Sequence, residues 1–473
     1  MDMDHLKVYS ITLDQLFNGT IEGFEGFEGS QKILIPEYQR PYVWKQKQII
    51  QLLSDLKASE KDCDKEKPLY YLGSIIIHQT KDGLQIIDGQ QRITTMLLIQ
   101  QFLKTDITTV HYSNPLSIHQ IKSNYEFLKA LFDGDHFDYL DLIDIKKSLQ
   151  FQNINVTLVI TKSEDLAYTF FETQNTGGVR LSGSDIIKAH HLRAVDNRKI
   201  VAYQAKRWEK NQKHVEDIIG YLGKLRYWDN RYWRQYPGYR MYTEKKNTVI
   251  NEFCIDTEKT DKDISYHYQI SENRNGNIYT STLSRFKQIR QPLNDGNNTL
   301  DYINDYLKLY TELFIDQNNH SIQEDFYTFY KNVVHGENGT IFLKDLFEAC
   351  IIAYVSKFGY ERLYEISLWV YRSIFSLRIT LDRNVREDSV FKLVRDTHLI
   401  DTILDIYTPE DLIKKFKKDR FKFNKNYTES THSKSKHIET LRSYFGDFKQ
   451  ASDYQEDYDF DKQFVSLIKE KLK

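Results

Sequence analysis

The sequence QIIDGQQRITT at residues 85–95 places polar side chains where a short apolar strand gives way to an apolar helix. N–H groups and the positive end of the helix dipole at such a turn attract a phosphate, and Arg92 in the first helical turn adds a charged donor. Asp88 would repel the phosphate unless it caps the helix from outside or a divalent cation such as Mg²⁺ bridges the two. The turn therefore indicates phosphate chemistry on a nucleotide or nucleic acid. The competing interpretation is a plain tight turn and N-cap, with Arg92 paired to a surface carboxylate.

A second polar segment, IPEYQRPYVW at residues 35–44, lies upstream and precedes an amphipathic run. Its two prolines hold the backbone extended, so Tyr38, Gln39 and Arg40 are expected on a stiff ledge before a helix. Aromatic rings alternating with Gln and Arg suit stacking on a base and contacts to its edges or phosphates. The alternative, left open, is that the rings pack on the core while Arg40 forms an ion pair.

These segments belong to a set of four that carries a family resemblance. The blocks IPEYQRPYVW, YYLGSIIIHQ, QIIDGQQRITTMLLI and FFETQNTGGVRLSGSDIIKAH occur in this order over residues 35–190. Together they resemble the DGQQR-motif family, typified by the GmrS half of the GmrSD type IV restriction system and the N-terminal part of SspE. The resemblance implies a ParB/sulfiredoxin-like α+β domain that binds a nucleoside triphosphate and is expected to hydrolyse it, in systems that attack phage or modified DNA.

The resemblance also implies roles for individual residues. The family's nucleotide-site motif falls on the DGQQR turn, where Asp88 would hold Mg²⁺ or position water while the other polar side chains stabilise charge on the phosphates. Its second motif falls on residues 38–40, near that site and near the region that senses modified DNA. Its third block includes Asn175 and Lys188. These residues either reach the nucleotide or only mark a helix end and contribute surface charge. The expected catalytic residues are Asp88, Gln90, Gln91 and Arg92, with Asp88 also the metal ligand, and the expected nucleotide or substrate contacts are Tyr38, Gln39, Arg40, Gly89, Thr94, Asn175 and Lys188.

Many fused members of the family carry a C-terminal HNH nuclease, of which this sequence shows no convincing copy. Such a ββα core needs a histidine to activate water and further side chains to orient it and to hold the metal. The candidates, none in a His-x-x-Pro setting, are His398, His432, His437, Asn424 and Asn426. DNA cleavage is therefore expected to need a separate HNH nuclease subunit, and a homo-oligomer is also open.

Two later segments have the composition of nucleic-acid contacts. Residues 226–240 interleave arginine with large aromatics, which suits stacking on unpaired bases, but helix packing with arginines over the rings explains the pattern too. Residues 414–425 hold seven basic residues and one acidic one, which suits a phosphate backbone or a solvated face above inward phenylalanines. The DNA-binding candidates are Arg231, Arg234, Lys414, Lys415, Lys417 and Lys418.

Composition sets the outer limits. A chain of 473 residues fits two domains, and a net charge of −2 means that DNA contact must use local basic patches. Three scattered cysteines indicate buried thiols in a reducing compartment. No basic leader and no membrane-length apolar run occur, so we expect a cytoplasmic protein without a membrane partner.

Strand patterns crowd the first third of the chain and helical patterns dominate the rest. Strands are predicted at residues 32–35, 70–78, 84–87 and 154–161, and helices at 303–314, 341–355 and 364–377. The second and third strands should form a hairpin through Lys81-Asp82-Gly83. The expected fold is α+β, with a ParB/sulfiredoxin-like domain over residues 1–200 and a mostly α-helical domain for DNA or partner binding over residues 201–473.

Two functions from different classes follow. The first is an enzyme, an NTP-hydrolysing, DNA-sensing component of a modification-dependent, type IV-like anti-phage restriction system. The second is a non-catalytic ParB-like regulator whose DGQQR site holds DNA or a nucleotide without turnover. Because the chain lacks a G-x-x-x-x-G-K-[ST] loop, any NTP hydrolysis must occur at the DGQQR turn.

Overall fold

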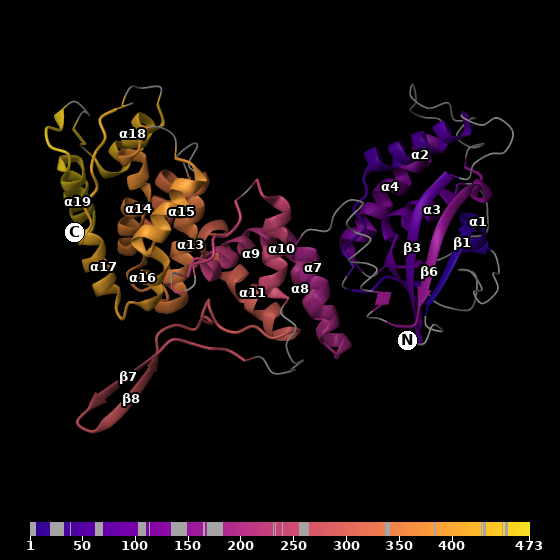
Figure 1. Cartoon of the computed structure of the whole chain (residues 1–473), viewed down its shortest axis with the longest axis horizontal. Helices are drawn as coiled ribbons and strands as arrows, with labels where there is room; N and C mark the ends of the chain where they lie inside the picture. Colours follow the sequence, from indigo (N-terminus) through magenta and orange to yellow (C-terminus); the bar gives the residue numbers. More distant parts are fainter. Residues whose placement is uncertain are drawn as a thin grey trace. The chain divides into compact units, whose positions relative to one another are not determined.

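The computed structural model divides into two compact units, residues 1–181 and residues 182–473. Figure 1 shows strands concentrated in the first unit and helices in the second. This arrangement confirms the predicted α+β order of a sheet-containing domain followed by a mostly helical one. The structure describes residues 6–18, 33–37, 39–61, 70–102, 110–112, 114–133, 149–163, 166–167, 183–229, 231, 233–238, 240–254, 264–335, 341–382, 385–426, 428, 432–446, 448–449 and 453–473.

The first unit is built on a six-stranded mixed sheet with strand order β1-β6-β3-β4-β2-β5. Strand β3 is central, because it pairs parallel with β6 on one side and antiparallel with β4 on the other. The tight turn at Lys81 and Asp82 joins β3 to β4, as the sequence predicts. The strands are β1 (Leu6–Thr12), β2 (Ile33–Leu34), β3 (Tyr70–Thr80), β4 (Gly83–Asp88), β5 (Val110–His111) and β6 (Ile154–Thr161).

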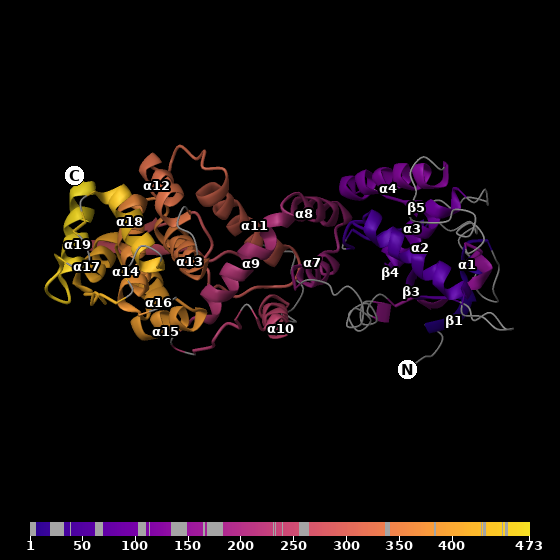
Figure 2. The ribbon, with the colours of Figure 1, turned by 90° about the horizontal axis from the view of Figure 1, so that it is seen from above.

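Helices cover this sheet and close its core. Figure 2 shows α2, α3 and α4 on the same side of β3 and β4. Alternate strand residues such as Ile75, Ile77, Leu84 and Ile86 belong to the same buried cluster as the apolar stripes of these helices. Period-two strands and helical stripes thus meet in one core. The helices are α1 (Leu13–Asn18), α2 (Gln46–Lys61), α3 (Gln90–Gln100) and α4 (Pro115–Asp133).

The four predicted strands are confirmed within a few residues, whereas β1 and β5 were not predicted. Strand β1 mixes apolar and polar residues and leaves Val8 60% exposed, so it lacks the continuous apolar run that marks β3. Strand β5 has only two residues, too few for a pattern. Both strands stand at the ends of the sheet, where only one neighbour constrains the sequence.

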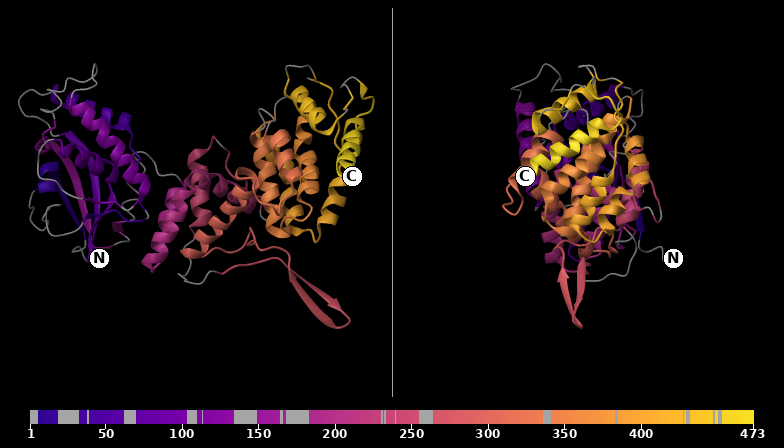
Figure 3. Two further views of the ribbon diagram at one scale, coloured as in Figure 1. Left: turned by 180° about the vertical axis from the view of Figure 1, so that it is seen from behind. Right: turned by 90° about the vertical axis from the view of Figure 1, so that its left-hand side faces the viewer.

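In the second unit (Figure 3), α13 and α14 pack on each other and are surrounded by α9, α11, α12, α15, α16, α17 and α18. These two helices are buried over almost their whole length, and the predicted helices at 303–314, 341–355 and 364–377 are confirmed. The α-helices of this unit are α7 (Gly183–Arg193), α8 (Arg198–Lys210), α9 (Gln212–Tyr227), α10 (Tyr242–Phe253), α11 (Asn297–Tyr310), α12 (Glu324–Phe329), α13 (Ile341–Phe358), α14 (Leu363–Thr380), α15 (Glu387–Thr397), α16 (Leu399–Asp405), α17 (Pro409–Lys418), α18 (Ser433–Phe445) and α19 (Asp459–Lys471).

A buried ion pair ties α14 to the C-terminal helix α19. The guanidinium of Arg372 donates to both carboxylate oxygens of Asp461, at 2.8 and 2.7 Å, and both side chains are 1% exposed. Arg372 also donates to the backbone carbonyls of Phe416 and Asp419. One side chain therefore holds α19 and the end of α17 against the core.

Helix α7 belongs to the second unit, so the boundary falls before the one that the sequence placed near residue 200. The helix packs on α10 and α11, and His191 fixes this contact. The Nε2 atom of His191 lies 2.7 Å from the carbonyl of Phe253, while its Nδ1 accepts from the N–H of Gly296 at 3.1 Å. Both ring nitrogens are thereby occupied. His191 and its neighbour His190, 2.9 Å from Asp295, form a structural cluster instead of an open metal site.

The structure also bears on the cysteines and on a membrane-spanning segment. Cys350 is buried, as expected, whereas Cys254 is partly exposed. Across the described part of the chain, no helix combines the length and apolar content needed to cross a membrane.

Candidate functional site

The DGQQR turn connects the central hairpin to α3 through a glycine whose backbone conformation and close packing disfavour a side chain. Gly89 has φ of +90°, in the left-handed region, and a Cβ on it would stand 3.1 Å from Cγ1 of Ile75. Glycine is the residue that adopts such a conformation without strain. The turn therefore brings the start of α3 directly against the neighbouring strand β3.

The start of α3 presents hydrogen-bonding groups that the described residues leave unused. No side chain caps the helix at Gly89, and the first N–H with an intrahelical acceptor is that of Ile93. The side chain of Gln90 is 4% exposed, and its Oε1 atom is buried without a hydrogen-bond partner in the described part of the chain. Uncapped N–H groups and a buried, unpaired amide oxygen are costly unless something binds them. This is the strongest local indication of a ligand.

Arg92 clamps the turn to β3. Its Nη2 atom donates to Oδ2 of Asp88 at 2.9 Å and to the carbonyl of Ser74 at 2.8 Å, and its Nη1 donates to the carbonyl of Leu72 at 3.2 Å. Both charged side chains are about a quarter exposed. The carboxylate that pairs with Arg92 is thus Asp88 itself, four residues earlier on the turn. Three of the five guanidinium N–H groups serve the protein.

Gly73 makes room for this clamp. It lies in β3 with φ of +116°, at a bulge in the pairing with β6 between Tyr71 and Gly73. The bulge turns neighbouring carbonyls toward Arg92. Sequence reasoning did not single out Gly73, although a glycine inside a strand pattern is a signal of a bulge or of close approach.

Gln91 and Gln39 join the two polar segments. The Oε1 atom of Gln91 accepts from the N–H groups of Val43 and Trp44, at 2.9 and 3.2 Å, and its Nε2 donates to the carbonyl of Pro41 at 3.0 Å. Gln39 in turn donates through Nε2 to the carbonyl of Ile87. The predicted proximity of the two segments is confirmed for Gln39. Gln91 and Gln39 act here as braces between segments.

A buried polar network continues along α3 behind the site. The hydroxyls of Tyr42 and Thr95 lie 2.8 Å apart, and Asn124 on α4 donates to the Tyr42 hydroxyl at 3.0 Å. The preceding residue, Thr94, contacts the hydroxyl of Tyr112 and donates to the carbonyl of Gln90 at 2.7 Å. Burial raises the pKa values of both tyrosines above their ordinary value, so both stay neutral donors. Sequence reasoning found Thr94 but missed the rest of this network, which carries no motif.

The remaining predicted ligands of the nucleotide fall into three groups. Arg40 is partly exposed next to Gln39. Lys188 lies on α7 in the second unit, where its amine is 3% exposed and 2.8 Å from Oε1 of Glu209. Tyr38 and Asn175 lie outside the described residues.

Among the described residues of 226–240, two aromatic rings follow the packing interpretation, and those of Tyr227 and Trp233 are partly exposed. Trp228 and Tyr236 are 1% exposed and cannot stack on a base without unfolding. Arg231 and Arg234 are 69% and 50% exposed, paired with Asp229 and Glu252 respectively. Arg234 also lies 4.0 Å from the centre of the Tyr227 ring. These two arginines are among the residues of the segment that solvent can reach.

The basic segment at 414–425 forms the second half of α17 and the chain that follows it. Of its three phenylalanines expected to point inward, Phe416 and Phe423 are buried and Phe421 is partly exposed. Lys414, Lys415 and Lys418 are exposed, and Lys417 is partly covered by Trp369 and Glu365. Lys414 pairs with Asp411 at 3.1 Å. This surface is accessible but partly neutralised.

The histidines and asparagines considered for an HNH centre do not gather around one possible metal position. His437 is 1% exposed and its ring stacks on Phe375, while Asn424 and Asn426 both donate to Asp382. In the described part of the chain, the one group of three or more metal-ligating side chains is the His190 cluster. The structure therefore adds no support for a nuclease centre in the second unit.

The first unit is thus a mixed-sheet domain whose polar site forms where a central hairpin passes into a helix. Residues 14–192 match the family model described as the GmrSD restriction endonuclease, N-terminal domain. This match confirms the resemblance seen in the sequence. Residues 200–434 match a second model, described as a family of unknown function, DUF7834. No curated protein matches the chain.

Proposed function

We propose that the first unit binds a nucleoside triphosphate with its phosphates against the first turn of α3. The uncapped start of this helix beside the buried, unpaired Oε1 of Gln90 is the observation that carries the proposal. N–H groups at a helix start form a ready anion site, and the helix dipole favours negative charge there. The arrangement uses backbone N–H groups at a helix start, which is also how a P-loop binds phosphates, although this chain has no P-loop sequence.

The residues present fit a divalent cation such as Mg²⁺. The Oδ2 atom of Asp88 accepts from Arg92, whereas Oδ1 has no partner among the described residues. Mg²⁺ needs only one or two carboxylates from a protein when phosphates and water complete its shell. Asp88 and the Oε1 atom of Gln90 would hold the ion, which would neutralise charge on the phosphates.

The biological role that this site supports best is a DNA-sensing, NTP-hydrolysing component of a modification-dependent, type IV-like restriction system acting against phage. The match to a restriction endonuclease domain supports DNA as the target. Arg231, Arg234 and the exposed lysines of α17 are the proposed DNA contacts, and cleavage would fall to a separate nuclease subunit.

A specific observation favours the second candidate, a binding module without turnover. Arg92 and Gln91 are the groups that would stabilise charge during hydrolysis, yet both already hold the protein together. A phosphate could then bind at the helix start without a free cationic group to assist its transfer.

Nucleotide binding and phosphate release by the full chain separate these candidates. ATP and GTP are titrated with Mg²⁺, and phosphate release is followed without DNA, with plain DNA and with base-modified DNA. Gln90→Met should weaken binding, because it removes the buried oxygen at nearly constant volume. Gln100→Met, at the buried far end of the same helix, is the matched control. Binding unchanged by Gln90→Met would refute the site, and binding without release would select the non-catalytic module.

A further inference from the structure

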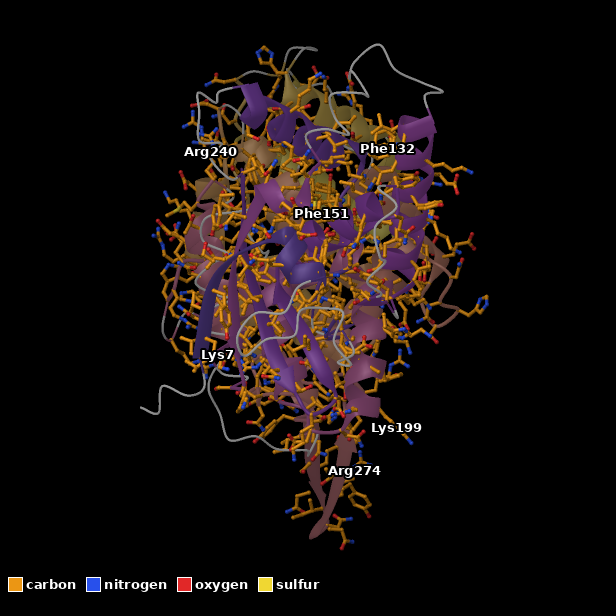
Figure 4. The ribbon with its side chains drawn as sticks, turned by 90° about the vertical axis from the view of Figure 1, so that its right-hand side faces the viewer. Lys7, Phe132, Phe151, Lys199, Arg240 and Arg274 are labelled. Atoms are coloured by element: carbon orange, nitrogen blue, oxygen red, sulfur yellow. The ribbon has the colours of Figure 1, made fainter. Side chains whose placement is uncertain are left out.

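The helical unit carries an isolated two-stranded β-ribbon, formed by β7 (Gln269–Arg274) and β8 (Asn277–Thr282). Figure 3 shows the ribbon projecting from the helices, and Figure 4 places Arg274 near its tip. Every residue of the ribbon except Ile270 is exposed, including Ile278 at 73% and Tyr279 at 55%. A lone two-stranded ribbon is at best marginally stable in water. Additional strands or a partner surface would stabilise it.

The pairing pattern of the ribbon fixes which backbone groups point outward. Its register runs unbroken from Gln269 opposite Thr282 to Arg274 opposite Asn277, and the N–H of Leu283 donates to the carbonyl of Tyr268 at 2.9 Å. Hydrogen-bonded and non-hydrogen-bonded pairs alternate in an antiparallel ladder. Counting from the bonded pair at Tyr268 and Leu283, the residues of β8 whose backbone groups face away from β7 are Ile278, Thr280 and Thr282.

The outer edge of β8 lacks the features that usually protect an edge strand from pairing with another strand. Its sequence NIYTST has no charge and no proline, and the ladder contains no bulge. Natural edge strands are usually protected by lysines, prolines or bulges, because an open edge is a template for another strand. The residues of β8 also favour the extended conformation.

We infer that β8 is a self-association edge, which pairs antiparallel with β8 of a second copy of this chain about a two-fold axis at Thr280. This register places Thr280 opposite its own copy and Ile278 opposite Thr282. The outward backbone groups of these residues then bond to one another, and the two ribbons become one four-stranded sheet. Each cross-strand pair is uncharged, so no like charges meet.

The charges of the ribbon argue against nucleic acid as the occupant. Arg274 is its one basic residue, and it forms an ion pair with Glu272. A ribbon that enters a DNA groove must neutralise phosphates, which a net charge of zero does not achieve. An uncharged edge suits an identical uncharged edge.

Charge substitutions at the two-fold position test the inference, with the full chain examined by sedimentation velocity over a range of concentrations. Thr280→Lys and Thr280→Glu each place like charges opposite one another and should raise the dimer dissociation constant at least about tenfold. An equimolar mixture of the two variants should restore the dimer, because a lysine would then face a glutamate across the two-fold axis. Ser271→Lys is the matched control on β7, since the hydroxyls of Ser271 and Thr280 lie 3.0 Å apart and either variant removes this contact.

Wild-type dimer, loss in both Thr280 variants, recovery in their mixture and an unaffected Ser271→Lys variant together support the edge. A chain that stays monomeric at every concentration overturns it, as does a dimer that Thr280→Lys leaves intact. A Thr280→Glu variant that sediments like the wild type but binds duplex DNA more weakly would assign the ribbon to nucleic acid and equally overturn the inference. None of these outcomes depends on nucleotide binding by the first unit.

Discussion

Atom Nη1 of Arg92 lies 1.9 Å from the point at which a Cβ atom on Gly73 would stand. No pair of atoms tolerates that separation without a bond, so the Arg92 side chain in its observed position requires glycine at residue 73. The contact links the second block of the sequence, YYLGSIIIHQ, to the DGQQR turn. The two blocks therefore constrain each other through space.

Gly73→Ala should consequently displace Arg92 and destabilise the first unit by roughly 2 to 4 kcal/mol, through backbone strain and lost hydrogen bonds. Gly359→Ala is the control, because Gly359 has φ of +63° with open space around it, and should cost only about 1 kcal/mol. Calorimetric melting of the full chain measures both. In an Arg92→Ala background the cost of Gly73→Ala should fall to that of the control; an unchanged cost would show that the two residues are independent.

Asp88→Asn and Arg92→Ala should behave differently from each other. Asp88→Asn removes the charge that would hold a cation and should abolish Mg²⁺-dependent nucleotide binding, with a change in stability below about 1 kcal/mol because the pair is partly exposed. Arg92→Ala also loses two contacts to β3 and should lower stability by roughly 1 to 3 kcal/mol. Equal melting of the two variants would contradict this division.

Gln91→Leu should loosen residues 41–44 without removing the site's charge. The substitution leaves two N–H groups and one carbonyl of this segment without their partner, at a cost of about 1 to 3 kcal/mol for each group that water cannot reach. Faster amide exchange at Val43 and Trp44 is the expected signal. Gln91→Glu keeps the acceptor and should protect both amides better; protection equal to wild type in the leucine variant would exclude the bracing role.

Arg372→Met should destabilise the helical unit by roughly 3 to 5 kcal/mol, because it leaves the carboxylate of Asp461 buried and unpaired. Adding Asp461→Leu should recover much of this loss, since the pair is then replaced by apolar contacts. Recovery should be incomplete, because the carbonyls of Phe416 and Asp419 still lose their donor. Urea unfolding of the single and double variants tests the coupling, and strictly additive effects would disprove it.

His191 should make the helical unit sensitive to mild acid. Burial, with a smaller contribution from neighbouring His190, lowers the pKa of His191 to about 3 in the folded chain. The unfolded chain takes up a proton near pH 6.5, so stability falls as the pH drops from about 6.5 toward 3 and is constant above this window. Between about pH 7.5 and about pH 5.5, the free energy of unfolding of the wild-type unit should fall by about 1 kcal/mol. His191→Gln should abolish this fall. Asp295 and His190 remain as a background in both proteins, and identical pH profiles would exclude His191 as the source.

The sequence predicted the elements that have strong local patterns. The isoleucine-rich runs of β3 and β6 and the apolar spacing of α13 and α14 determine their own structure. The ribbon of β7 and β8 was missed although Asn275-Gly276 is a strong hairpin signal, because the surrounding pattern is helical. A short polar ribbon carries little hydrophobic periodicity.

The position of the candidate site was predictable, but the partners of its side chains were not. The turn at Asp88 and Gly89 follows from the strand, the glycine and the helix around it. That Gln91 holds the segment before α2, and that Arg92 reaches the backbone of β3, depend on how distant segments fold together. A motif identifies which residues are polar and close in sequence; it does not distinguish a residue that contacts ligand from one that braces the contact.

The contacts that hold the DGQQR turn come from residues close to it in the sequence. The contacts of Arg92 reach back only to Leu72, Ser74 and Asp88, so β3, β4 and α3 build the turn from one continuous stretch of chain. Strand β1, in contrast, pairs with β6 from the far end of the unit. Short-range contacts form at low loop-closure entropy, ahead of pairings between distant segments. During folding, the DGQQR turn can therefore take shape before the outer strand of the sheet docks.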